Sequence, residues 1–81
     1  MLEQLKTEAK LVGVKQIRKA LARHEVKTVF LAADADPFLT QPIAEACRAD
    51  GVELISVPSM QELGRACGIQ VGSACAAILR G

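Results

Sequence analysis

The chain has 81 residues, of which 51% are hydrophobic and 2% aromatic, and its formal net charge is +1 at pH 7. A chain of this length makes one domain, expected over residues 1–81, and no apolar run approaches the roughly 20 residues that would cross a membrane. Its three cysteines are odd in number and lack C-x-x-C spacing, which excludes a disulfide framework and a zinc site and predicts a reducing, cytoplasmic location.

The charge is divided unevenly along the chain. Residues 1–27 contain seven Lys or Arg and three Glu, a balance of 7 − 3 = +4, whereas residues 28–81 contain three Arg and six Asp or Glu, a balance of 3 − 6 = −3. A basic end of this kind favours the docking of one polyanion on one face of the protein. It disfavours indiscriminate coating of DNA or RNA.

The first elements are predicted to be a short helix, a brief strand and a basic helix. Apolar residues recur at helical spacing up to Val12, and the chain then reaches Gly13. In the segment that follows, the arc that should be buried consists of Ile17, Ala20, Leu21 and His24, with Val14 at its edge. The histidine is interpreted as a packing residue. The opposite face carries Lys15, Gln16, Arg18, Lys19 and Arg23.

This basic face is the strongest functional signal in the sequence. Like charges one turn apart, as in Lys15, Lys19 and Arg23, repel one another, and an anionic ligand would relieve that repulsion. The start of the helix adds unpaired N–H groups and a positive dipole end, and Gly13 has no side chain that would keep a phosphate away. The spacing alone leaves two interpretations open, an RNA-binding helix and a solvated basic surface.

The first long strand should be central in the sheet. Residues 28–33 form a continuous apolar and β-branched run after a polar link at residues 25–27. A run without polar alternation is typical of a strand that is buried on both faces. Another strand is expected over residues 52–57.

The helix between these strands has a clear cap but an uncertain first turn. Asp36 is placed to cap a helix that has Pro37 at its first position. Pro42 either lies in an irregular first turn or moves the helix start to about Thr40. The pattern therefore fixes the helix only over Ile43–Asp50.

The last third of the chain predicts a short helix, a loop and a final strand. Ser59-Met60-Gln61-Glu62 matches a capping box that opens a helix ending near Cys67, and Gly68 can adopt the left-handed conformation that closes it. A loop over residues 69–72 leads to an alanine-rich strand over residues 73–79. Helices that alternate with apolar strands predict an α/β fold, a three-layer α/β/α sandwich around a mixed, mostly four-stranded sheet.

No catalytic constellation, cofactor site or metal site is predicted. The single histidine has no nucleophile beside it, and Gly64-x-x-x-Gly68 lacks the Lys-Ser/Thr pair of a phosphate-binding P-loop. Asp34 and Asp36 follow a strand and could ligate magnesium, but a capping role already accounts for an Asp before proline. The two aromatic residues, Phe30 and Phe38, lie in apolar sequence contexts, so stacking platforms for RNA bases are not expected.

Taken together, these landmarks resemble a known family. Gly13-Val14-Lys15-Gln16-Ile17-Arg18-Lys19 resembles the G-x-(N/K)-(E/Q)-x-x-K signature of the L7Ae and L30e ribosomal proteins, which bind kink-turn RNA. Ala33-Asp34-Ala35-Asp36-Pro37 is similar to the strand exit of that family, and residues 57–59 and 63–69 are similar to its capped helix and hydrophobic loop. The similarity covers essentially all 81 residues and is greatest to the bacterial, ribosome-associated members.

The resemblance implies a non-catalytic RNA-binding protein that recognises and stabilises kink-turns, which are sharply bent duplexes with tandem sheared G·A pairs. It implies that Lys15 and Gln16 reach guanine edges in the widened groove. Arg18 and Lys19 would hold phosphates, and the loop would pack against the nucleotide flipped out at the kink. The full RNA-binding set implied is Gly13, Val14, Lys15, Gln16, Arg18, Lys19, Cys67, Gly68, Ile69, Gln70 and Val71.

One pair of residues departs from the family pattern. Archaeal relatives carry Asn-Glu where this chain has Lys15-Gln16. A glutamate accepts hydrogen bonds from guanine N1 and N2, whereas a glutamine does so only weakly, so the substitution bears on both affinity and the recognition pattern.

The expected partner is a structured RNA that contains a kink-turn, such as ribosomal RNA or a riboswitch, and the ribosome is a further partner that fits. No DNA, membrane or cofactor is expected, and the protein should be a monomer. The 67–71 loop is expected to be an exposed apolar patch that RNA orders. Two alternatives stay open: a protein-interaction module that uses this loop, and a small magnesium-dependent phosphoryl-transfer enzyme that uses Asp34 and Asp36.

Overall fold

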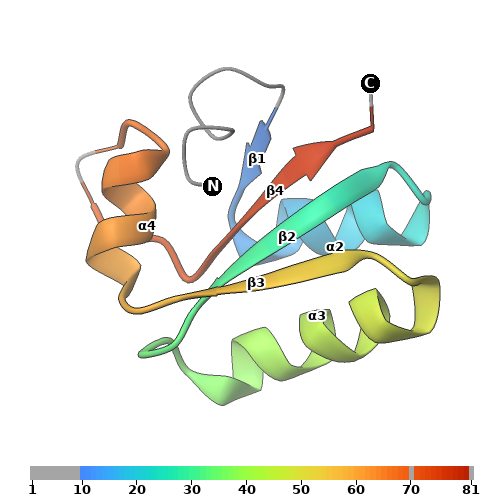
Figure 1. The fold of residues 1–81 in the computed structure, drawn as a ribbon, viewed down its shortest axis with the longest axis horizontal. Coiled ribbons are helices and arrows are strands. Elements are labelled where there is room, and N and C mark those ends of the chain that lie inside the picture. Colours follow the sequence, from blue (N-terminus) through green and yellow to red (C-terminus); the bar gives the residue numbers. More distant parts are fainter. Residues whose placement is uncertain (1–9, 70, 81) are drawn as a thin grey trace.

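The computed structural model describes residues 10–69 and 71–80, which form one four-stranded sheet and three helices (Figure 1). The strands are β1 (Lys10–Val12), β2 (Val26–Ala32), β3 (Glu53–Val57) and β4 (Cys75–Leu79), and the helices are α2 (Val14–Ala22), α3 (Pro37–Asp50) and α4 (Met60–Ala66). The helix predicted before Lys10 lies outside the described residues. Among the described helices, none has the length and apolar character needed to traverse a bilayer.

The sheet is mixed, with the strand order β1-β4-β2-β3. β2 pairs in parallel with β3 and antiparallel with β4, and β1 pairs antiparallel with the other side of β4. The register places Phe30 of β2 between Ile55 of β3 and Ala76 of β4. The central position predicted for this strand is therefore confirmed.

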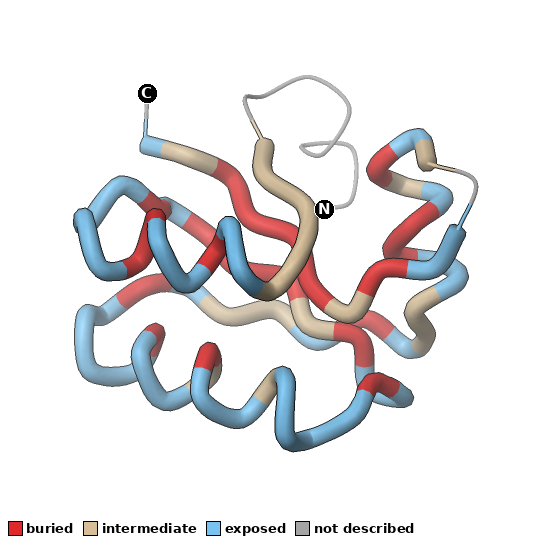
Figure 2. The backbone as a smooth tube through the Cα atoms, turned by 180° about the vertical axis from the view of Figure 1, so that it is seen from behind, coloured by how far each residue is buried: buried red, intermediate tan, exposed pale blue. Residues whose placement is uncertain are grey.

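Two apolar clusters lie on opposite faces of the sheet and make the fold three layers deep (Figure 2). Successive side chains of a strand point to opposite faces, so Val29 enters the cluster beneath α2 and α3 while Phe30 enters the cluster beneath α4. Both residues are fully buried, and complete burial of such side chains contributes about 1.5–3 kcal/mol each. The small side chains of Ala76 and Ala77 in β4, also fully buried, leave room for helices on both faces. The predicted α/β/α sandwich is confirmed.

Helix α3 is longer than the range that the sequence pattern predicted as helix, because the helix continues through Pro42. It begins at Pro37 and continues through Pro42 to Asp50, so neither the irregular first turn nor the start near Thr40 is observed. Pro42 has no N–H to donate to the carbonyl of Phe38. Phe38 is exposed at the outer side of the first turn, where water can satisfy that carbonyl.

Two strand boundaries also differ from the prediction. β2 begins at Val26, inside the segment predicted as a polar link, because Val26 is buried and pairs with Leu79 across an irregularity in the register. β4 begins at Cys75 and not at Ser73. The Ser73 hydroxyl donates a 2.7 Å hydrogen bond to the Cys75 carbonyl, and the Ser73 N–H donates to the carbonyl of Met60, so the chain is held against α4 before the strand starts.

Candidate functional site

The three described helices all begin at one edge of the sheet. β1 and β2 both run antiparallel to β4, and β3 runs parallel to β2, so β1, β2 and β3 point in the same direction. Each of these three strands is followed in the chain by a helix. The N-termini of α2, α3 and α4 therefore gather at the carboxyl ends of the strands (Figure 1). Helix N-termini bring unpaired N–H groups and partial positive charge to this edge.

The starts of α3 and α4 are closed by side chains. Asp36 Oδ1 accepts a 2.9 Å hydrogen bond from the N–H of Phe38, which confirms the predicted cap of α3. Ser59 Oγ accepts a 3.1 Å hydrogen bond from the N–H of Glu62, the forward half of the predicted capping box. Both helix starts carry an intramolecular acceptor where an anion would otherwise bind.

The start of α2 is open. Its N-cap is Gly13, with φ +107°, and within the described residues there is no side-chain cap and no acidic residue in the first turn. The Gly13 N–H donates to the Cys75 carbonyl at 3.4 Å, which ties the turn to β4. A Cβ built on Gly13 would meet no atom of the described residues within 4 Å, so among these residues nothing blocks an incoming group from the backbone. A helix start with free N–H groups and open space is a ready anion-binding site.

α2 has a buried apolar face and an exposed basic face, as the sequence predicted. Ile17, Ala20 and Leu21 are buried against the sheet and α3, whereas the charged residues are exposed (Figure 2). The charged and polar residues on the outer face are Lys15, Gln16, Arg18, Lys19 and Arg23. Over residues 10–69 and 71–80, none of the four basic side chains forms an ion pair with a carboxylate. Their mutual repulsion is therefore not offset by the described part of the chain.

Two hollows flank this basic face. A hollow of about 570 Å³ has Lys15, Arg18 and Lys19 in its wall. A second, of about 240 Å³, has Gln16, Lys19 and Arg23 in its wall. Lys19 lines both hollows. The basic side chains therefore lie at a concave surface that a bulky anion can enter.

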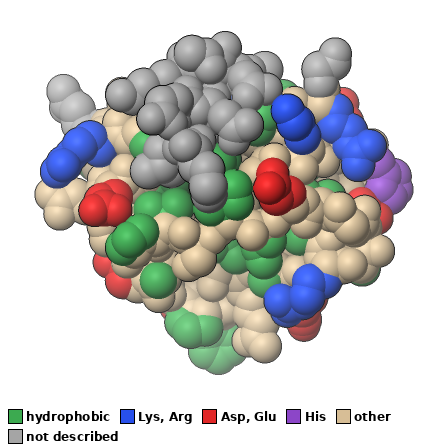
Figure 3. Space-filling model, viewed as in Figure 1, with side chains coloured by type: hydrophobic (Ala, Val, Ile, Leu, Met, Phe, Trp, Pro, Cys, Tyr) green, Lys and Arg blue, Asp and Glu red, His purple; other side chains and the backbone are tan. Residues whose placement is uncertain are grey.

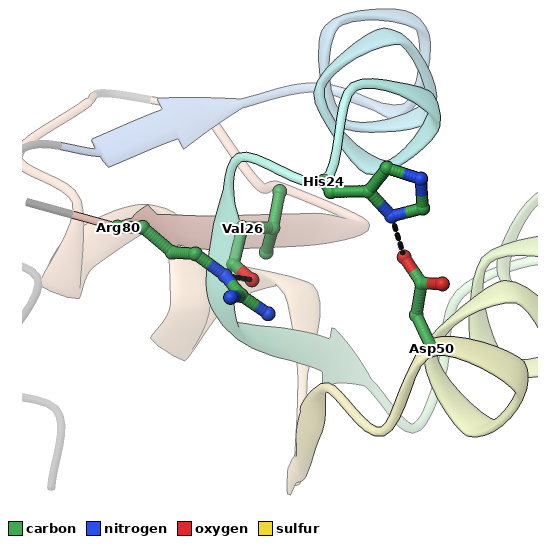
Figure 4. Close-up of polar contacts among 4 residues, drawn as sticks. All are labelled: His24, Val26, Asp50 and Arg80. Carbon is green, nitrogen blue, oxygen red and sulfur yellow. Dashed lines mark hydrogen bonds and ion pairs between the residues drawn. The ribbon is translucent and has the colours of Figure 1, made fainter.

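The prediction that His24 packs in the core is wrong. α2 ends before it, and His24 takes a left-handed backbone conformation with φ +57° and a side chain that is 71% exposed. Its Nδ1 lies 2.7 Å from Oδ2 of Asp50 at the end of α3 (Figure 4). The helical projection failed because the N–H groups of His24 and Glu25 turn back to the carbonyls of Leu21 and Ala20 and close the helix.

The loop after α4 returns to the same edge as the start of α2. Its path is fixed by two backbone bonds: the Ile69 N–H donates to the Gly64 carbonyl at 3.1 Å, and the Ser73 N–H donates to the Met60 carbonyl at 3.0 Å. Two residues after Ser73 the chain reaches Cys75, whose carbonyl accepts from Gly13. The segment that leaves the loop, residues 73–75, thus contacts the open helix start, although the two are far apart in sequence.

Only part of the 67–71 loop is the exposed apolar patch that was predicted. Cys67 is buried, and Ile69 is half-buried against the cluster beneath α4, so these two side chains serve the core. Gly68 has the predicted left-handed conformation, with φ +80°, and Val71 is 70% exposed. Gln70 lies outside the described residues. The ordering of this loop by RNA stays a prediction.

Both aspartates of the predicted strand exit accept a hydrogen bond from a backbone N–H at the start of a helix. Asp36 caps α3, and Oδ1 of Asp34 accepts a 2.8 Å hydrogen bond from the N–H of Met60. Within the described residues, no group of three His, Cys, Asp or Glu is arranged to hold a metal ion. The three cysteines are buried free thiols, and burial raises the pKa of each above its usual range.

The two phenylalanines, which both stand in apolar sequence contexts, differ in their exposure. Phe30 is fully buried, but Phe38, at the second position of α3, is 89% exposed. The helical period contains a signal for this exposure: Phe38 lies two places after the N-cap, on the side of the helix opposite Ile43 and Cys47. The hydrogen bond between Asp34 and Met60 could not be predicted from local sequence pattern, because it joins residues 26 positions apart.

The chain is similar to known proteins over nearly its whole length. Residues 2–81 match the model of the ribosomal protein L7Ae/L30e/S12e/Gadd45 family. An RNA-binding protein of Bacillus pumilus is 46% identical over 69 residues, which are 85% of this chain and 84% of that protein. RNA-binding protein YbxF of Geobacillus stearothermophilus is 41% identical over 70 residues, 86% and 85% of the two chains. The solved structure of the Giardia lamblia 15.5kD RNA binding protein superimposes with a TM-score of 0.91 at 30% identity, covering 99% of this chain and 71% of that chain.

Proposed function

The chain belongs to the ribosomal protein L7Ae/L30e/S12e/Gadd45 family, and from that premise we propose that it binds kink-turn RNA through the open start of α2. Its relatives are named RNA-binding proteins, which makes the general function RNA binding without catalysis. The family name favours ribosomal RNA as the natural partner.

The observation that carries the proposal is the contrast among the three helix starts. Asp36 and Ser59 close two of them, while no side chain of the described residues caps the start at Gly13, and exposed basic side chains follow it in α2. A phosphodiester supplies the acceptors and the negative charge that this start lacks. The acidic residues at the other two starts keep phosphates away from them, so RNA is directed to α2.

The kinked form of the RNA is taken from the resemblance to kink-turn-binding proteins, and the shape of the binding element is compatible with it. The major groove of A-form RNA is too deep and narrow for side chains to read, and a helix start enters it only where the duplex is opened. Lys15 and Gln16, in the first turn, then reach base edges, for which amine and amide donors are suited. Arg18 and Lys19, one turn further on, contact phosphates.

The two alternative functions have less support. A magnesium-dependent enzyme would need Asp34 and Asp36 free for a metal, but each accepts a backbone hydrogen bond at a helix start. A protein-interaction module built on the 67–71 loop would need an apolar surface there, and of its described apolar side chains only Val71 is exposed.

A gel shift tests the proposal. The wild-type protein is titrated against a kink-turn RNA and against the same RNA with its G·A pairs changed to Watson–Crick pairs. We expect tighter binding to the kink-turn by a factor of ten or more, because base-edge contacts discriminate by about 1–3 kcal/mol each. Equal affinity for the two RNAs would overturn the specificity that is proposed.

A further inference from the structure

β3 is an outermost strand of the sheet, and one of its sides is free. The strand order β1-β4-β2-β3 leaves this side without a strand partner among the described residues. Outermost strands are usually short, bulged or protected by lysine or proline, because their unpaired N–H and C=O groups can pair with another chain. β1, at the opposite side of the sheet, has three residues and begins with Lys10. β3 pairs regularly with β2 from Glu53 to Val57 and contains neither lysine nor proline.

Two apolar side chains of β3 are incompletely covered. Leu54 packs against the cluster beneath α2 and α3, and Ile55 against the cluster beneath α4. Both are half-buried, whereas their partners in β2, Val29 and Phe30, are fully buried. The difference arises because β2 has a strand on each side. A further strand along the free side of β3 would cover the remaining apolar surface, which favours association.

A hollow lies beside the free side of β3. It has a volume of about 300 Å³, with Leu54, Ile55 and Ser56 of β3 in its wall, together with Pro37 and Thr40 at the start of α3. Hydrophobic surface at the start of α3 is seen at the lower edge of Figure 3. Side chains at alternate positions of an added strand project to one face of the sheet, so one of them can enter this hollow.

The charge around the free side of β3 selects the partner. Residues 33–57, which include α3 and β3, contain one Arg and five Asp or Glu, a balance of 1 − 5 = −4. RNA is repelled by such a surface, and so is a second copy of the chain, which carries the same acidic residues. A basic polypeptide is attracted. We propose that the free side of β3 binds an extended, basic segment of a partner protein, which adds a strand to the sheet.

This peptide site is separate from the RNA site. β1 and β3 are the two outermost strands, three strand spacings or about 14 Å apart. α2 follows β1 directly in the chain. The peptide and the RNA therefore approach different sides of the molecule, and one protein can hold both at the same time.

Amide hydrogen exchange, followed by NMR, tests the site. The probe is a short capped peptide in which lysine and valine alternate. One control is the same peptide with every backbone nitrogen methylated, and another is a peptide in which glutamate and valine alternate. Only the lysine peptide should slow exchange within residues 53–57, and it should do so at alternate positions, because successive N–H groups of a strand point to opposite sides. Exchange at Gly13 and Lys15 should not change.

Two exposed positions provide matched charge variants. Ser56→Lys adds a positive charge to β3, and Gln61→Lys adds the same charge to α4. Ser56→Lys should weaken binding of the lysine peptide roughly fivefold and Ser56→Glu should tighten it by a similar factor, whereas Gln61→Lys should have less than about a twofold effect. Unfolding midpoints show that each variant is folded. A gel shift should show that Ser56→Glu still prefers the kink-turn RNA to its Watson–Crick variant.

Four results would overturn the inference and leave the proposed function intact. The first is unchanged exchange in residues 53–57 with the lysine peptide. The second is equal binding of the methylated peptide, which would mean that charge alone holds it. The third is self-association of the free protein through β3, which would assign the strand to a second copy, and the fourth is protection of β3 by RNA. Loss of the G·A preference by wild type would instead overturn the proposed function alone.

Discussion

The carboxylate of Asp34, just after β2, accepts a 2.8 Å hydrogen bond from the backbone N–H of Met60, the first residue of α4. The bond joins the β2–α3 turn to the element that carries the 67–71 loop. It also gives Asp34 a structural role, because a carboxylate that is bonded to a helix N–H contributes to stability without any metal. The edge that we propose for RNA binding is thus braced by a hydrogen bond within the protein.

Replacing Asp34 should therefore lower the free energy of unfolding, and no catalytic role of this residue would be lost. Asp34→Ala removes the acceptor for the Met60 N–H and should reduce the free energy of unfolding by about 1 kcal/mol, as loss of a helix cap does. Asp34→Asn keeps an acceptor oxygen and should cost less. Urea unfolding of the three proteins measures both values, and equal stability of Asp34→Ala and wild type would mean that the bond contributes nothing.

Gly64 should be intolerant of a side chain. A Cβ at this position would lie 2.1 Å from the carbonyl oxygen of Val71, so the loop backbone would have to move. In an ordinary helix Gly→Ala stabilises by roughly 0.5–1 kcal/mol, whereas Gly64→Ala should destabilise by a few kcal/mol. Gly51→Ala is the control: Gly51 has φ +69° with no atom near its Cβ position, so only about 1 kcal/mol of backbone strain is expected. A smaller loss for Gly64→Ala than for Gly51→Ala would contradict the tight packing.

Alkaline pH should weaken the fold through its buried thiols. Burial, with a smaller effect of Cys47 nearby, raises the pKa of Cys75 from about 9 to about 11. Between these values the unfolded chain loses a proton from this thiol that the folded chain keeps, so the free energy of unfolding falls as pH rises. Cys75→Ala is the comparison because it removes this thiol alone, and its stability should fall less steeply from pH 9 to 11. Identical slopes would show that Cys75 does not contribute.

The fold was predictable where local pattern and burial agree. The apolar run over residues 28–33 predicted a central strand, and Asp36 before Pro37 predicted the cap, because both signals depend on neighbouring residues. The failures occurred at element ends. His24 fits the apolar arc of α2 only if the helix continues, and the backbone bonds that stop it cannot be read from side-chain spacing.

The basic helix of the site could be predicted from the sequence, but the arrangement of the residues around it could not. Lys15, Arg18 and Lys19 were identified from periodicity and charge, and the structure places them together on exposed surface. The burial of Cys67 and the half-burial of Ile69 depend on how α4 sits on the sheet. Sequence pattern does not determine such tertiary contacts, so the pattern left both residues in a loop that was predicted to be exposed.

Lys15 and Gln16 should decide which RNA is bound, and Lys19 how tightly. Lys15→Ala and Gln16→Ala are expected to reduce the preference for G·A over Watson–Crick RNA, since base-edge contacts carry sequence information. Lys19→Ala should weaken the binding of both RNAs alike. It should also lower the slope of log affinity against log salt concentration by about one, since a phosphate contact releases one counterion. Titrations at several salt concentrations separate the two classes. Loss of discrimination in Lys19→Ala with an unchanged salt slope would reverse the assignment.

The open start of α2 can be observed directly by NMR of the backbone amides. Kink-turn RNA is added to the isotopically labelled protein, and the Watson–Crick variant of that RNA serves as the control. The account predicts that the amide signals of Gly13, Val14, Lys15 and Gln16 shift strongly with the kink-turn and weakly with the control. Those near the His24–Asp50 pair, at the opposite end of α2, should stay in place with both. Strong shifts near Asp50 with unmoved signals at residues 13–16 would contradict the claim that this helix start is the RNA-binding site.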